Sequence, residues 1–203
     1  MEPAVPPSSG CSPRTALFID AAYLDKLCTG PWAHGGAPLA LDMRRLPALL
    51  NDGVRPWRVF YYHALPWRSD PPLPVEEAVF ARRAAFVAFL ARDPRWVLRE
   101  GRLERRGGRR PGDWLYEQKR TDVQIAVDLV RLAWRGEIQR AVLLTGDSDL
   151  LPAVEDARAA GVHVSLRYAP GHVHADWLSA CDAGEPLLET QVRQILRAPR
   201  SPA

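Results

Sequence analysis

The sequence predicts an α/β protein with a central, mainly parallel sheet of about five strands and helices on both faces. Short apolar runs alternate along the chain with longer amphipathic stretches, the pattern of strands joined by crossover helices. Crossovers of this kind join parallel strands and cover both faces of the sheet. The length of 203 residues and the apolar fraction of 47% are typical of one globular domain that buries a proper core.

The elements alternate in order. Apolar segments predict strands at residues 15–19, 57–63, 95–103, 141–145 and 162–168. Helices are expected at residues 21–28, 42–51, 76–92, 121–135, 151–160, 175–183 and 187–197. The buried stripe expected for the helix at 121–135 consists of Val123, Ala126, Val127, Val130, Ala133 and Trp134. This choice leaves Asp128 on an exposed face, beside Gln124, Arg131 and Arg135.

The composition of the chain ends and the placement of the cysteines indicate the domain organisation. We expect a disordered tail at 1–13, rich in proline and serine, one folded domain at 14–185 with a basic insertion near 99–118, and a C-terminal helix and tail at 186–203. No signal peptide and no membrane-length apolar segment is found, so a cytoplasmic protein is expected. The three scattered cysteines predict neither a disulfide framework nor a zinc site.

Positive charge gathers in one segment. Residues 95–120 hold nine basic residues against four acidic ones. The hairpin arginines, Arg105, Arg106, Arg109 and Arg110, are interleaved with glycine and suit a phosphate backbone, because guanidinium groups pair with phosphate oxygens at two points. The same residues also fit a solvated hairpin tip, and both readings stay open. Most tryptophans and tyrosines fall on apolar faces, with Trp67 and Trp114 near loops as exceptions.

Four aspartates occupy positions suited to a metal site. Asp20 ends the first apolar run, Asp147 and Asp149 follow the fourth, and Asp122 begins the helix before the fourth strand. Polar chemistry collects at the carboxyl ends of parallel strands, so these carboxylates converge if the first and fourth strands are neighbours. Clustered carboxylates repel one another unless a cation compensates, and oxygen ligands suit Mg²⁺ or Mn²⁺.

Each aspartate also has a structural explanation. Asp149 is able to cap the helix at 151–160, Asp122 to stabilise a helix dipole, and Asp147 to form an ordinary turn. Gly146 is expected to let the backbone turn sharply as it leaves the strand. The pair His172-x-His174 has no third ligand nearby in sequence, and we interpret it as loop or surface.

Three motifs carry a resemblance to a known family. LFID at 17–20, KRTDVQIAVD at 119–128 and LTGDSDLLPAV at 144–154 resemble, in this order, the NYN domain family in its LabA-like branch. The resemblance implies a Rossmann-like, PIN-type three-layer sandwich and metal-dependent hydrolysis of RNA. On that analogy Asp20, Asp122, Asp147 and Asp149 match the acidic Mg²⁺ or Mn²⁺ site, and Lys119 matches the lysine that opens the second motif. Tyr23 stands where the family often has asparagine.

The sequence therefore supports a metal-dependent endoribonuclease, with a catalytically weak or inactive RNA-binding or regulatory module as the alternative. The four aspartates favour the first, and Tyr23 leaves room for the second. A haloacid-dehalogenase-like phosphatase is disfavoured because Ala22 stands where that chemistry needs a second aspartate, and no P-loop motif is present. The expected partner is RNA, single-stranded or structured. The oligomeric state stays open, a homodimer included.

Overall fold

Six parallel strands form the central sheet of the protein. The computed structural model describes residues 13–33, 36–107 and 114–197. Neighbouring strands follow the order β3-β2-β1-β6-β7-β8, and every pair in this sheet is parallel. The strands are β1 (Thr15–Asp20), β2 (Arg58–His63), β3 (Trp96–Glu100), β6 (Arg140–Leu144), β7 (His163–Tyr168) and β8 (Ala183–Pro186). The predicted parallel α/β fold is confirmed, with six strands in the sheet rather than about five.

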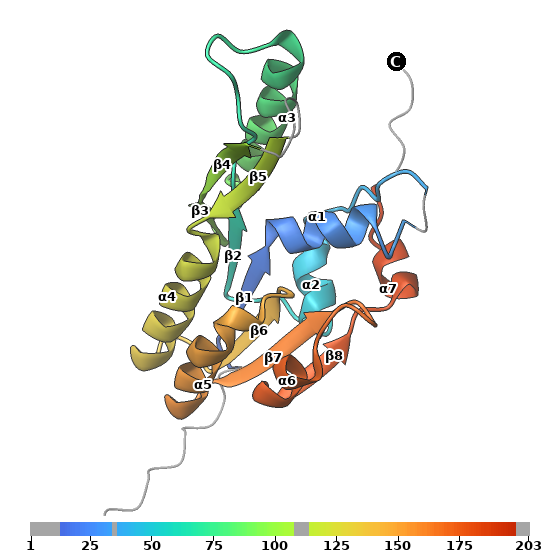
Figure 1. The fold of residues 1–203 in the computed structure, drawn as a ribbon. Coiled ribbons are helices and arrows are strands. Elements are labelled where there is room, and N and C mark those ends of the chain that lie inside the picture. The colour runs from blue at the N-terminus through green and yellow to red at the C-terminus, as the bar shows by residue number, and fades with distance from the viewer. Residues whose placement is uncertain (1–12, 34–35, 108–113, 198–203) are drawn as a thin grey trace, which may run out of the picture.

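Helices cover both faces of this sheet, which gives three layers (Figure 1). One face carries α1 (Ala21–Thr29), α2 (Leu46–Leu50) and α7 (Glu189–Arg193), and the other carries α4 (Thr121–Trp134), α5 (Leu151–Ala159) and α6 (Ala175–Ala180). Strand β1 is apolar throughout because both of its faces are buried. Leu17 and Ile19 pack into one core, whereas Ala16 and Phe18 pack into the other.

The strand order places the switch point between β1 and β6. The chain runs outward from β1 through β2 to β3 and then returns to the other side of β1 with β6. The two strands are in direct register, with Ile19 opposite Leu144. The expected adjacency of the first and fourth apolar strands is therefore confirmed, and the residues that follow them emerge at one edge of the sheet.

An arm projects beyond the carboxyl ends of β2 and β3 (Figure 1). It consists of α3 (Pro74–Leu90) and an antiparallel hairpin of β4 (Arg102–Gly107) and β5 (Trp114–Lys119). The single strand expected at 95–103 is thus broken at Gly101. A Cβ at this position would lie 2.7 Å from both the Lys119 carbonyl oxygen and Thr121 Cγ2, so glycine allows the chain to pass against the start of α4.

The predicted buried face of α4 is wrong. Val123 is 67% exposed and Val127 is 55% exposed, and Trp134 is exposed as well, although Ala133 is buried as expected. The core-facing residues are Thr121, Ile125, Asp128, Leu129, Leu132 and Ala133. The predicted face and the observed buried face of α4 both contain apolar residues. Which of them is buried depends on the side chains of the sheet that lie beneath the helix.

Asp128 is the clearest consequence of that choice, because it is 3% exposed rather than on the surface. Its carboxylate accepts hydrogen bonds from Tyr62 Oη at 3.1 Å and from Arg99 Nε at 2.7 Å, and it also pairs with Arg131. Tyr62 lies on β2 and Arg99 on β3. Asp128 therefore fixes α4 onto the sheet, and the expectation of a surface ion pair is corrected.

The C-terminal region adds an element that the sequence did not predict. β8 pairs with β7 where only helices were expected, and α6 and α7 are shorter than predicted. Beyond β8, Val192 and Ile195 pack into the core beside α1 and α2. Cys28 and Cys181 are buried and free, whereas Cys11 lies outside the described residues. Within the described ranges, no helix combines the length and apolar character needed to cross a membrane.

Candidate functional site

Asp20 and Asp147 lie where the chain leaves two neighbouring strands. Asp20 ends β1 and caps α1, since its Oδ1 accepts a hydrogen bond from the Ala22 amide at 2.9 Å. Asp147 follows β6 and caps the short 3₁₀ helix η1 (Ser148–Leu150), accepting from the Asp149 amide at 2.9 Å. Both carboxylates are thus held by backbone groups at the switch point of the sheet.

Burial and mutual repulsion characterise this group of carboxylates. The pKa of Asp20 is raised to about 6, because burial and, to a lesser extent, the charges of Asp122 and Asp147 outweigh the lowering effect of two backbone amides. The pKa of Asp122 is also raised, first by burial and then by the charge of Asp147, with Asp149 adding to it. The four predicted aspartates therefore influence one another electrostatically, as carboxylates do when they share a site.

The four residues are not equivalent. Asp122 lies in the first turn of α4 and accepts a hydrogen bond of 3.4 Å from Thr121 Oγ1. Asp149 is exposed and lies within η1. It does not cap α5, because Leu150 occupies the N-cap position there without a side-chain hydrogen bond. Asp20 and Asp147 line the pocket described below, whereas Asp122 is linked to both through its charge, and Asp149 to Asp122.

A pocket of about 380 Å³ opens beside Asp20 and Asp147. Besides these two carboxylates, its lining consists of Ala22, Tyr23, Lys26, Gly146, His172 and His174. The two histidines come from the loop between β7 and α6 and were interpreted from sequence as loop or surface. One signal could have found them: they follow the carboxyl end of β7, where the rule that selected Asp20 and Asp147 also applies.

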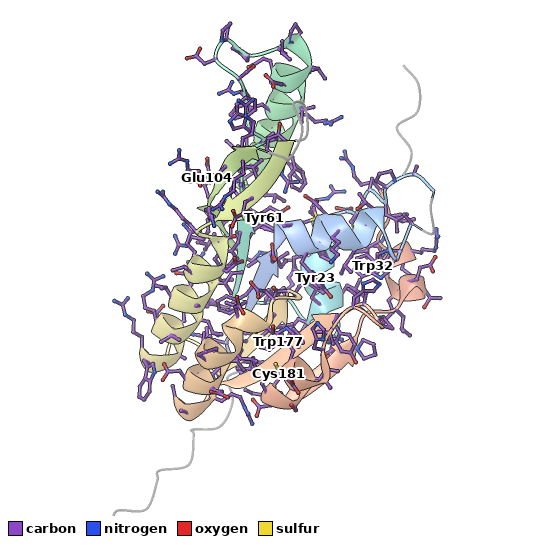
Figure 2. All side chains as sticks on the ribbon, in the orientation of Figure 1. Tyr23, Trp32, Tyr61, Glu104, Trp177 and Cys181 are labelled. Atoms are coloured by element: carbon purple, nitrogen blue, oxygen red, sulfur yellow. The ribbon has the colours of Figure 1, made fainter. Side chains whose placement is uncertain are left out.

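Tyr23 fills the space between α1 and the end of β6 (Figure 2). A Cβ on Gly146 would lie 2.6 Å from Tyr23 Cε2, so only glycine leaves room for this ring. The φ angle of Gly146 is not positive, unlike those of Gly136, Gly161 and Gly171. Glycine at this position is therefore required by the Tyr23 ring, and no positive φ requires it.

The donor set at this edge suits a hard divalent cation, since it offers carboxylate oxygens at a point of negative charge. In the part of the chain that the structure describes, no three acidic, histidine or cysteine side chains are arranged to hold a metal ion as they stand. The pKa values of Asp20 and Asp122 are nevertheless raised, mainly by burial and in addition by neighbouring carboxylates whose charge no described cation balances. A cation would relieve that charge, so the residues fit one chemically.

The basic hairpin begins next to this site, because β5 ends at Lys119 just before Asp122. Lys119 pairs with Glu117, and Arg106 Nε lies 2.6 Å from the same carboxylate. The Arg105 guanidinium stacks on Trp67, 4.1 Å from the ring centroid, and Trp67 contacts Tyr116 at 6.3 Å between centroids. Arg109 and Arg110 lie outside the described residues. The hairpin places Arg105 about three residues, or roughly 10 Å, beyond Lys119.

Two other acidic residues lie away from the site. Asp128 belongs to the buried network beneath α4. Asp182 accepts hydrogen bonds from the Val164 amide at 2.8 Å and from Arg158 Nε at 2.9 Å. Val164 lies near the start of β7, at the opposite edge of the sheet from Asp20. Neither residue therefore contributes to the pocket.

Comparison with known proteins identifies the family. The model of the NYN domain matches residues 14–186, and this family has a PIN-like nuclease fold. The chain is also similar to the crystal structure of a protein of unknown function from Vibrio parahaemolyticus, with 14% sequence identity and a TM-score of 0.60. That similarity covers 94% of this chain and 100% of the other, and it supports the fold alone. No curated protein matches.

Proposed function

Because the chain belongs to the NYN domain family, we propose that it is a metal-dependent endoribonuclease that hydrolyses RNA phosphodiester bonds. The observation that carries this proposal is the placement of Asp20. A carboxylate whose pKa is raised to about 6 by burial and by Asp122 and Asp147 stands at the switch point of a parallel sheet. Such perturbed groups concentrate at functional sites.

In this proposal Asp20, Asp122, Asp147 and Asp149 would hold Mg²⁺ or Mn²⁺. The bound ion supplies charge neutralisation at the phosphate and a more acidic water. The chain's own contribution is to hold the carboxylates in place through the backbone amides of Ala22 and Asp149.

The hairpin would bind the RNA backbone beside this centre. Arg105 and Arg106 lie on the strand that pairs with the one ending at Lys119, so these three residues follow one another along the hairpin. The pairing of Arg106 and Lys119 with Glu117 occupies part of their donor capacity, but a guanidinium has five N–H donors and an ammonium has three. These residues are therefore expected to affect RNA affinity rather than the reacting phosphate.

The alternative is an RNA-binding or regulatory module of the same fold that cleaves weakly or not at all. Tyr23 favours it, since a buried aromatic ring takes the position where the family often has asparagine. The two proposals differ in one measurable respect. Only the nuclease requires the acidic cluster for a chemical step.

The test is incubation of the purified protein with labelled RNAs and matching DNAs in Mn²⁺, Mg²⁺ or EDTA. We expect internal RNA cleavage that needs a divalent ion and is lost in Asp147→Asn. The control is Glu155→Gln, which removes an exposed charge from α5 and should cleave normally. Binding without cleavage by the unmodified protein, under every metal condition, would contradict the nuclease proposal in favour of the alternative.

A further inference from the structure

The hydroxyl of Tyr23 is a buried polar group without a hydrogen bond. The residue is 7% exposed, and its Oη has no partner among the described residues. Tyr62 on β2 is buried as well, but its hydroxyl donates to Asp128. An unpaired buried hydroxyl is unfavourable, and a bound ligand is one of the explanations for such a group. Tyr23 also lines the pocket beside Asp20, which makes a molecule bound in that pocket the candidate partner.

The Tyr23 hydroxyl is a donor at neutral pH. Burial raises its pKa above the usual value of 10, and the charge of Asp20 raises it further, so the phenolic proton is retained. The Ala169 amide opposes this by favouring the phenolate, but it does not reach hydrogen-bond geometry. An amide is also a donor itself. What the pocket lacks is an acceptor for the phenolic proton.

The same wall of the pocket carries further donors. Lys26 lies one turn after Tyr23 on α1, and His172 and His174 face the pocket from the loop after β7. An ammonium, two imidazoles and a phenol thus stand beside the carboxylates of Asp20 and Asp147. The pocket lining therefore combines carboxylates suited to a cation with donors suited to an anion that has several acceptor oxygens.

We propose that Tyr23, Lys26, His172 and His174 form a phosphate-binding subsite that takes the phosphate next to the scissile one in an RNA strand. The assignment of RNA as the source of that phosphate rests on the proposed function. A phosphate group has enough acceptor oxygens for several of these donors. The pocket volume of about 380 Å³ lies within the range of small-ligand sites. In this arrangement Tyr23 replaces the usual asparagine by a donor that reaches the substrate.

The direct test uses inorganic phosphate and needs no cleavage. Metal-free protein is titrated with phosphate while the imidazole signals of His172 and His174 are followed by NMR. We expect saturable shifts at both histidines, and Tyr23→Phe should weaken phosphate affinity about three- to tenfold, the range for one lost hydrogen bond. The same variant should raise KM for RNA by a similar factor and leave kcat nearly unchanged.

A matched control separates binding from folding. Tyr23→Phe removes only an unpaired hydroxyl, so its melting temperature should stay equal or rise, whereas Tyr62→Phe loses a real hydrogen bond and should melt lower with normal phosphate affinity. The subsite is overturned if phosphate leaves both histidines unshifted, or if Tyr23→Phe binds phosphate normally. It is also overturned if Tyr23→Phe weakens Mn²⁺ binding and leaves phosphate affinity intact. Phosphate binding that depends on Tyr23, in a protein that cuts no RNA, would support the subsite and reject the nuclease.

Discussion

Replacing Asp20 by asparagine should stabilise the metal-free protein at neutral pH. The pKa of Asp20 rises from 3.8 to about 6 on folding because of burial and neighbouring negative charge. Above both values, this difference corresponds to about 3 kcal/mol of unfavourable free energy in the folded state. Asparagine caps helices as well as aspartate does, so the hydrogen bond from the Ala22 amide is kept. Asp20→Asn should therefore gain about 1–3 kcal/mol at pH 8.

The stability gained by Asp20→Asn must increase with pH. The folded protein binds the Asp20 proton more tightly than the unfolded chain does, so stability falls as the pH rises from 3.8 to about 6. The unfavourable free energy of ionised Asp20 is fully present above about pH 6 and absent below pH 3.8. The advantage of Asp20→Asn should therefore be full at pH 8 and vanish near pH 4. For a chain of this size, it corresponds to an increase in melting temperature of roughly 3–10 °C.

Urea denaturation in EDTA at several pH values measures this difference, with Asp182→Asn as a control of opposite sign. Burial opposes ionisation of Asp182, but the Val164 amide and Arg158 together lower its pKa, so this carboxylate stabilises the fold at neutral pH. Asp182→Asn should lose stability at pH 7 and lose less as the pH falls. If Asp20→Asn destabilises the protein at pH 8, or changes its stability equally at every pH, Asp20 is a structural residue and the site assignment fails.

Three further predictions concern other parts of the molecule. Alanine at all four hairpin arginines should raise KM for RNA and leave kcat unchanged, and the log–log slope of KM against salt should flatten by nearly one unit per lost phosphate contact. Alanine at the exposed Arg135 is the control and should change neither KM nor its salt dependence. A collapse of kcat in the fourfold variant would place the arginines in the reacting centre. Gly146→Ala should lower the free energy of unfolding by about 1–3 kcal/mol, because the added methyl group displaces the Tyr23 ring. Calorimetry should find a smaller loss when the same substitution is made in Tyr23→Ala, and an equal loss in both backgrounds would show that the two residues do not interact. Asp128→Ala should cost about 3 kcal/mol in urea denaturation, because it leaves Arg99 and Tyr62 without their acceptor; normal stability with lost cleavage would refute its structural role.

The sequence alone determined the parallel α/β fold, the family and the aspartates that end strands. These follow from local information. An apolar run buried on both faces ends where the chain reaches the sheet edge, so Asp20 and Asp147 could be placed without knowing what lay around them. The adjacency of their strands was a conditional inference, and the register of β1 with β6 confirmed it.

Only the tertiary structure decided which face of α4 is buried and what surrounds the carboxylates. Hydrophobic periodicity favoured the stripe with Val123 and Val127, because apolar side chains lie on both sides of this helix. The other stripe is buried because β2 and β3 present Tyr62 and Arg99, and these groups satisfy Asp128 in the interior. β8 was missed for a similar reason, since the sequence AGEP has no strand pattern and is extended only by pairing with β7.

The donor wall of the pocket also required the assembled fold. Tyr23 and Lys26 come from α1, whereas His172 and His174 come from a loop nearly 150 residues later in the chain. A single histidine or lysine in a loop carries no local signal that distinguishes a site from a surface. The acidic residues were recognisable because strand ends mark them in the sequence. Their polar neighbours were not, because proximity between distant segments arises only when the strands pair and the helices pack.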